Sequence, residues 1–561
     1  MPEREYTEEE IQDLTDRVFL LRQQLEAGKM HFAAHLVDDF RRSYEAIRLR
    51  SDGRVDPTTV DGRIRAATLA VRVMKDRSDA KAAISLGDIQ EAYFNFLFRH
   101  FGWLFDRMIK AGVGPSQAAQ AMMKDEGFLK QLKTGLPGLA SELRDFWGAA
   151  GDPGAYHLQD GDQLKATFAG DLFPAPSENA VSTAGLYIDT IVLPCPVTRI
   201  APLLGVAPDE EVARLLVKHT LTAMTYREVA TAAITPPIAL ILPSPDDVDR
   251  EMRKGLVSRA EPAMLKHGSY LFGRQFESLA DLGDFCSDLQ SVEDVAKELK
   301  GGDRLLFDTE WDPNPIAQLS RAMAERQPVI PGLDSSCAGH HVLGTCYGRM
   351  PQALGAQENA THFRGTPLIN ADTSWRYYTW LLEYESLSAA VDLERSKGAH
   401  IARALSSEAD QNLAWLGNVP PSSVIEIRKS GLAPELRKML SAGVGELIQA
   451  NPANYFRTAD QVVENLDRAF RDHQRALLQA RQKKLKLYGV DVGSFVATGA
   501  IAVTAALTSS PALGALSGLL GISGLPNLKD LKSRFKTQAE EDRARQSSPT
   551  GLLFKHVRRR N

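Results

Sequence analysis

The alternation of hydrophobic and polar positions changes character several times along the chain. In the first 150 residues, apolar side chains recur every three or four positions, as they do on the buried face of an amphipathic helix. Thr7 and Glu10 have the spacing of a capping box, and the apolar pattern begins at Leu14, directly after this predicted helix start. We therefore expect a helical domain over residues 1–150.

Aromatic side chains are densest in the stretch from Ile89 to Ile109, where they point in every direction around the predicted helix. A helix that is apolar on all sides is either a central core helix or a membrane segment. Because Arg99 and Asp106 interrupt this stretch, we interpret it as a core helix. It also lacks the interleaved basic residues that a platform for stacking nucleic-acid bases needs.

The pattern changes to strand type in the middle of the chain. Residues 151–183 are rich in Gly, Pro, Asp and Ser, which predicts a linker or a long loop. Leu186–Leu193 and Ile238–Leu242 are short apolar runs separated by a helical pattern, and this combination predicts two neighbouring parallel strands. Arg304–Phe307 is a third strand candidate, and Pro328–Ile330 is a weaker fourth.

Helical spacing returns from Trp375 onward and ends in a long helix. Thr458 and Gln461 suggest a second capping box, and from Val463 to Leu487 apolar positions alternate at spacings of three and four. The predicted fold is mixed α+β and predominantly helical. Its expected parts are a helical domain (1–150), a linker (151–183), an α/β domain with a small, partly parallel sheet (184–370), a helical region (371–450), a long basic helix (451–488), an apolar helical hairpin (489–528) and a basic tail (529–561).

The predicted hairpin is a stretch without any charged side chain, from Val492 to Leu528. Pro511 divides it into two apolar arms, and small residues such as Gly514 and Gly518 recur at spacing four, which lets two helix backbones approach closely. The longer arm, of about 17 residues, would measure about 25 Å as a helix, which is shorter than the hydrocarbon core of about 30 Å. We therefore do not expect it to cross a bilayer.

Charge separates the two ends of the chain. Residues 451–561 contain 18 Lys and Arg against 9 Asp and Glu, a net charge of +9. Because the whole chain has a net charge of −5, residues 1–450 have a net charge of −14. Basic residues flank the hairpin on both sides: Lys483, Lys484, Lys486, Lys529, Lys532 and Arg534. Such flanks favour contact with an anionic cytoplasmic leaflet. The alternative is a hairpin buried within protein, with these cations forming a solvated rim.

Composition limits the number of domains and the classes of protein to which the chain can belong. With 561 residues, 43% hydrophobic and 24% charged, the chain should hold two to four globular domains. The overall negative charge argues against generic nucleic-acid binding. Four cysteines in so long a chain do not form a disulfide framework, and the charged N-terminal segment does not have the pattern of a signal peptide. We expect a cytoplasmic protein, with peripheral attachment to the inner membrane face as an alternative.

Two groups of residues could carry chemistry. Acidic residues follow the predicted strands, where the ligands of α/β sheets bind and where carboxylates can hold Mg²⁺; these are Asp246, Asp247, Asp249, Asp308, Glu310, Asp312 and Asp334. The same residues serve equally well as helix N-caps. The second group, Cys337, His340, His341 and Cys346, has zinc-ligand chemistry but not the spacing of a common zinc motif, and either cysteine is also a conceivable thiol nucleophile.

No sequence motif requires a cofactor, since the chain has neither a glycine-rich phosphate loop nor a GxSxG elbow. His219 lies on the apolar stripe of its helix and is expected to be a core histidine. A long basic helix, a Gly/Ala-rich apolar hairpin and the terminal SSPTGLLFKHVRRR together resemble uncharacterised bacterial proteins encoded among stress and phage-defence functions. The resemblance covers the last hundred residues and transfers no functional residue.

These observations favour a non-catalytic bacterial effector or interaction protein whose C-terminal module docks on an anionic membrane or a protein partner. Oligomerisation stays open. The alternative is a metal-dependent hydrolase with its site at the strand ends of the central domain, where Asp246 and Asp308 would be metal ligands.

Overall fold

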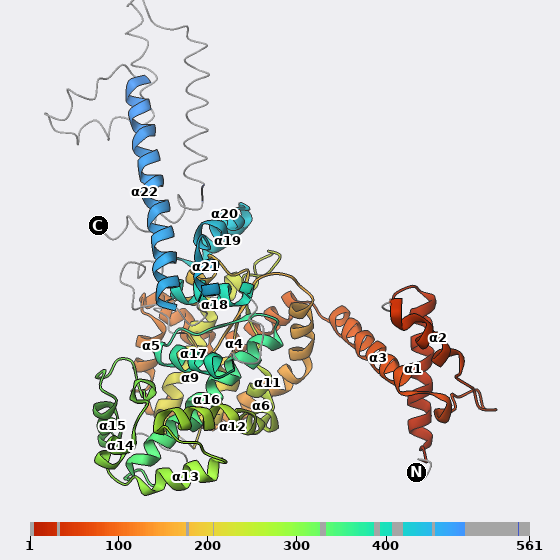
Figure 1. The fold of residues 1–561 in the computed structure, drawn as a ribbon. Coiled ribbons are helices and arrows are strands. Elements are labelled where there is room, and N and C mark those ends of the chain that lie inside the picture. The colour runs from red at the N-terminus through yellow and green to blue at the C-terminus, as the bar shows by residue number, and fades with distance from the viewer. Residues whose placement is uncertain are drawn as a thin grey trace, which may run out of the picture. The chain divides into compact units, whose positions relative to one another are not determined.

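The computed structural model describes residues 5–30, 34–174, 179–205, 207–325, 333–385, 393–406, 419–450, 455–487 and Ser548. The chain divides into two compact units, one formed by residues 1–92 and 145–161 and the other by residues 93–144 and 162–561. Figure 1 shows the elements of both units along the chain. The predicted hairpin and basic tail, with Gly514, Gly518, Lys529, Lys532 and Arg534, lie outside the described residues.

The first unit is helical, as the spacing of its apolar residues predicts. Its described elements are α1 (Glu8–Glu26), η1 (Ala34–Leu36), α2 (Val37–Glu45), η2 (Pro57–Thr59), α3 (Gly62–Ala83), the start of α4 (Leu86–Ala111) and the end of α6 (Glu126–Gln159). The predicted capping box is confirmed: Glu10 N donates to Thr7 Oγ1 at 3.2 Å, and Thr7 N donates to Glu10 Oε2 at 2.9 Å. Leu14, Val18 and Leu21 of α1 pack with Ile64 of α3 in the core of this unit.

The second unit contains the remaining helices and the sheet. Up to the last strand, its described helices are the rest of α4 and α6, α5 (Pro115–Met122), α7 (Ala180–Ala184), α8 (Pro196–Ile200), η3 (Ala201–Leu203), α9 (Asp209–Thr225), α10 (Arg227–Ala230), α11 (Pro245–Val248), α12 (Arg250–Phe272), α13 (Leu279–Asp288), α14 (Val292–Glu298), η4 (Gly302–Arg304), α15 (Pro315–Ala324) and α16 (Ala338–His362). After that strand come α17 (Asp372–Glu385), α18 (Leu393–Ser406), α19 (Pro421–Lys429), α20 (Ala433–Leu440), α21 (Val444–Ala450) and α22 (Tyr455–Leu487).

The sheet is parallel and small, with the order β3-β2-β1-β4. Its strands are β1 (Lys165–Phe168), β2 (Thr190–Leu193), β3 (Ala239–Ile241) and β4 (Thr366–Leu368), and every residue in them is buried. The predicted pairing of the first two strand candidates is confirmed, because β2 and β3 are parallel neighbours with Ile191 opposite Ala239. The chain therefore forms a predominantly helical α+β fold.

Several predicted boundaries differ from the structure. Residues 151–183, expected to form a linker, contain the end of α6 and the central strand β1. Arg304–Phe307 is not a strand: Arg304 ends η4, and Leu305 and Phe307 are buried among the surrounding helices. Thr458 is not a helix cap, since α22 already begins at Tyr455. The candidate strand Pro328–Ile330 lies outside the described residues.

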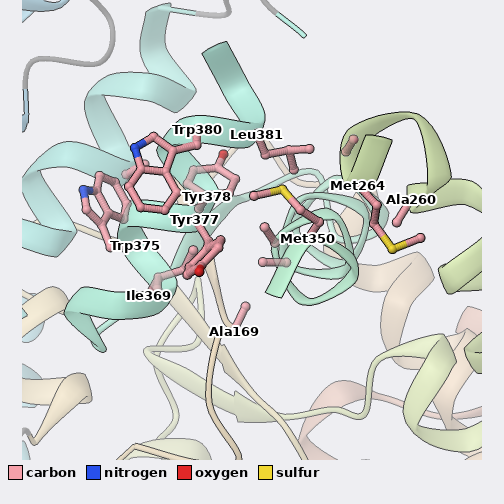
Figure 2. Close-up of a cluster of buried hydrophobic side chains, with 14 of the residues drawn as sticks. Ala169, Ala260, Met264, Met350, Ile369, Trp375, Tyr377, Tyr378, Trp380 and Leu381 are labelled. Carbon is pink, nitrogen blue, oxygen red and sulfur yellow. The ribbon is translucent and has the colours of Figure 1, made fainter. Parts of the chain in front are cut away.

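Aromatic side chains of α17 form the centre of one hydrophobic core. Figure 2 shows this cluster, with Trp375 and Trp380 on one side, Met350 of α16 in the middle and Met264 of α12 on the other side. Ala169 and Ile369 of the same cluster follow β1 and β4 directly, so this core covers the carboxyl ends of those two strands. The chain runs from β1 through β2 to β3 and then returns to the other side of β1, which places the change of direction between β1 and β4. In open α/β sheets such a switch point is where ligands bind.

Candidate functional site

The carboxyl edge of the sheet carries a buried ion pair. Arg199, on α8 after β2, donates from Nη2 to Asp247 Oδ2 at 2.9 Å and from Nε to Asp247 Oδ1 at 3.1 Å. The Arg199 and Asp247 side chains retain 13% and 5% of their exposure. Arg199 also donates to the carbonyl oxygen of Asp171 at 3.2 Å, so it joins the segments that follow β1, β2 and β3. Sequence reasoning missed Arg199, because only the fold places it opposite an acidic residue.

Asp246 and Asp247 are neighbours in different environments. Asp247 is paired with Arg199 and accepts a hydrogen bond from Ser244 N at the start of α11. Asp246 Oδ1 is buried without a hydrogen-bond partner, and burial followed by the charge of Asp247 raises the pKa of Asp246, while Arg199 opposes the rise. Acid–base catalysis often uses two neighbouring carboxyl groups whose environments differ enough to separate their pKa values. Such a pair also arises wherever one of two adjacent carboxylates meets an arginine, and the contacts of Asp247 are those of a structural pair.

The other acidic candidates act locally. Asp249 caps α12, accepting from Glu251 N at 2.8 Å. Asp308 Oδ1, Asp312 Oδ1 and Asp334 Oδ1 each accept a backbone N–H from the residue two positions later, at 3.1, 2.7 and 2.8 Å. These contacts are those of helix caps and turns, which also favour Asp.

The cysteines and histidines near residue 340 are engaged in packing and in local hydrogen bonds. Cys337 is buried, and its thiol donates to the carbonyl oxygen of Leu289 at 3.4 Å. Both ring nitrogens of His340 have partners, Ser287 Oγ and the Asp334 carbonyl oxygen, each at 3.0 Å. His341 Nε2 lies 2.9 Å from the carbonyl oxygen of Ser335.

Cys346 lies further along α16 and is buried, and burial raises the pKa of its thiol to about 12, which opposes formation of a nucleophilic thiolate. Within the described ranges, no three His, Cys, Asp or Glu side chains gather closely enough to hold a metal ion. The structure thus does not bring Asp246 or Asp308 together with the cysteine and histidine candidates as a ligand set. The expected core role of His219 agrees with its burial and with a pKa lowered to about 3, chiefly by that burial.

A second buried charge cluster lies at the amino edge of the sheet. Asp189, directly before β2, accepts from Arg428 Nη1 at 2.6 Å and also pairs with Arg437. Leu164 N donates to the other carboxylate oxygen of Asp189 at 2.9 Å. Arg428 lies on α19 and Arg437 on α20, so this carboxylate ties two C-terminal helices to the sheet.

The predicted long basic helix exists as α22, and its two ends differ in burial. Tyr455, Thr458, Val462 and Leu466 are buried, whereas no described side chain from residue 467 to residue 476 is. Lys483, Lys484 and Lys486 fall in the last turns of the helix. None of the helices that the structure describes is long and apolar enough to span a bilayer.

Comparison of this chain with protein-family models, with curated proteins and with solved structures found no match.

Proposed function

We propose that this protein is a non-catalytic interaction protein whose basic, apolar C-terminal module docks on an anionic membrane surface. The observation that carries the proposal is the division of α22 into a buried base, up to Leu466, and a continuation whose described side chains, residues 467–476, are not buried. A role in bacterial stress or phage defence, exerted from the cytoplasm, is supported by the resemblance of the last hundred residues to proteins of that kind.

The base of α22 is fixed by packing and by hydrogen bonds. Thr458 is fully buried and lies 2.8 Å from His400 Nδ1 on α18. Asn465 Nδ2 donates to the carbonyl oxygens of Ala442 and Leu440 at 2.8 and 3.2 Å, which joins α22 to the end of α20 and the turn after it. These contacts set the direction in which the helix leaves the rest of the second unit.

The exposed part of α22 is supported by ion pairs along its own surface. Glu464 pairs with Arg468 at 2.7 Å, and Asp467 pairs with Arg471 at 3.2 Å, both with the acidic residue four positions before the basic one. That order is the favourable one on a helix and contributes about 0.3 to 0.5 kcal/mol per pair. Figure 1 shows α22 running on past α19, α20 and α21. From Leu466 to Leu487 the helix is about 30 Å long.

This geometry supports an arm that carries its terminal lysines away from the base of the helix. Lys483, Lys484 and Lys486 stand at its far end, next in sequence to the uncharged stretch from Val492. Each basic residue near an anionic leaflet contributes about 1 kcal/mol, so the three together supply about 3 kcal/mol. A protein partner with an acidic, apolar surface would offer the same chemistry and is the competing outcome. The alternative of a metal-dependent hydrolase lacks a cluster of metal ligands among the described residues.

Vesicle flotation tests the proposal. The full chain should float with vesicles that contain phosphatidylserine and not with vesicles of phosphatidylcholine alone, and a chain without residues 489–561 should not float. Replacing Lys483, Lys484 and Lys486 by Gln should weaken binding about 150-fold, whereas replacing them by Arg should change it little. Absence of flotation at low salt, or equal binding by the Gln and Arg variants, would refute membrane docking.

A further inference from the structure

The helix α4 has one buried face and one exposed face, which corrects the expectation that its aromatic side chains are all in the core. Within the second unit, its buried face consists of Tyr93, Phe94, Leu97, Phe101, Leu104 and Met108. Arg227 of α10 lies over the Phe98 ring, 4.8 Å from its centroid, so this side of the helix is covered as well. Trp103 nevertheless keeps 51% of its exposure.

Contrary to the expectation that basic residues do not interleave with the aromatic side chains of this stretch, cations surround the exposed indole on the same side of the helix. Arg99 and Arg107 are four residues before and after Trp103, and Lys110 is seven residues after it, so all four side chains share one helical face. We call these four residues the Trp103 face. Its three cations are exposed, and they form no ion pair with any side chain in the described part of the chain. Asp106 is exposed on the same helix, so the charged residues of α4 from Arg99 to Lys110 carry a net charge of +2.

Packing holds the indole in place at this surface. The rings of Trp103 and Phe128 of α6 meet edge to face, with their centroids 6.0 Å apart and an interplanar angle of 73°. Ile109, about 120° around the helix from Trp103, and Val113, just after the end of α4, keep 58% and 37% of their exposure. An exposed tryptophan that packs against a neighbouring helix and stands among cations combines two features of a helix that lies at a membrane interface.

We propose that the Trp103 face is a second contact with an anionic lipid surface, with the indole at the level of the headgroups. The inference rests on the proposed function for the kind of surface involved, but it uses residues far from the C-terminal module. Charge selects the occupant: three cations against one carboxylate, within the first 450 residues that carry −14 overall, fit an anionic leaflet. An amphipathic tryptophan fits the boundary between headgroups and acyl chains.

Fluorescence quenching by brominated phosphatidylcholine, mixed with phosphatidylserine in vesicles, tests the proposal on the full chain. Vesicle binding should quench part of the tryptophan emission, and Trp103→Phe should abolish that part. Arg107→Glu combined with Lys110→Glu should weaken binding at least 25-fold, because each cation lost costs about fivefold and each new anion adds repulsion. The matched control is Lys297→Glu combined with Lys300→Glu. Lys297 lies on α14 and Lys300 just after its end, both are exposed, and this double variant should change binding less than threefold.

The outcomes separate this inference from the proposed function. Quenching that survives Trp103→Phe, or equal weakening by the two double variants, overturns the Trp103 face while leaving docking through α22 intact. Quenching at Trp103 that persists when Lys483, Lys484 and Lys486 are replaced by Gln supports the face and counts against the C-terminal module. If the chain binds a single-stranded oligonucleotide through the same cations and ignores vesicles, the lipid assignment is wrong.

Discussion

Substitution of the buried histidine His267 should make the second unit less sensitive to acid. His267 has no exposed surface, and its Nδ1 lies 3.0 Å from the hydroxyl of Tyr384, while its Nε2 has no hydrogen-bond partner. Burial, followed by the positive charge of Arg304, lowers the pKa of His267 to about 3. Its imidazole is therefore neutral in the folded protein at any pH above that value.

The sign of the pH effect follows from comparing the folded and unfolded chains. An unfolded histidine has a pKa of about 6.5, so between pH 6.5 and pH 3 the unfolded chain binds a proton that the folded chain does not. Stability is complete above pH 6.5 and falls as the pH is lowered through this window. Each pH unit costs about 1.4 kcal/mol, so lowering the pH from 7 to 5 removes about 2 kcal/mol through His267 alone.

The measurement is a double difference. Urea unfolding of the second unit is followed at pH 7 and pH 5 for the natural chain and for His267→Gln, which keeps a polar side chain that does not titrate. The variant will be less stable at pH 7 because the packing changes, but it should lose about 2 kcal/mol less than the natural chain on going to pH 5. Equal losses in the natural chain and in His267→Gln would refute the reasoning.

Two further predictions concern packing and buried charge. In α16, Gly339→Ala would place a Cβ atom against the backbone carbonyl of Cys286 and should lower the free energy of unfolding by about 1 to 3 kcal/mol. Gly344→Ala, with open space around the new Cβ atom, should raise it by about 0.5 to 1 kcal/mol. Thermal unfolding should therefore show a lower melting temperature for the first variant and a higher one for the second. Asp247→Asn leaves the buried Arg199 without its carboxylate and should lower the free energy of unfolding by about 3 to 5 kcal/mol. Glu464→Gln, in an exposed ion pair, should lower it by less than about 1 kcal/mol. Comparable losses of stability would show that burial does not determine how much these ion pairs contribute.

The sequence was sufficient to predict the two strands that are rich in apolar residues, β2 and β3, and not to predict β1 and β4. β3 is an uninterrupted apolar run, β2 is apolar after Thr190, and their parallel pairing follows from the helix between them. β4 contains Pro367, a residue that argues against a strand in a sequence, yet β4 is at the edge of the sheet, where a missing N–H is tolerated. β1 begins with Lys165 inside a stretch rich in Gly and Asp, so its central place in the sheet could not be read from local composition.

The candidate sites show the same limit. Asp246 and Asp247 are identical side chains next to each other in the sequence. Arg199, contributed by another strand end, makes Asp247 an ion-pair partner, whereas burial and the charge of Asp247 raise the pKa of Asp246. The aromatic residues around Trp103 predicted a core helix correctly for one face. Which face stays exposed depends on α10, from a distant part of the sequence, and on α6, which is separated from α4 by α5.

The length of α22 explains why opposite charges in one chain need not neutralise each other. At physiological ionic strength, the field of an exposed charge is screened over about 8 Å, while the helix from Leu466 to Leu487 extends for about 30 Å. Lysines at the end of such a helix are several screening lengths from its base, so acidic side chains beside the base do not neutralise them. A shorter arm would leave the cations within reach of acidic side chains on the same unit. The ion pairs along α22 stabilise the helix and thereby keep its end about 30 Å from Leu466.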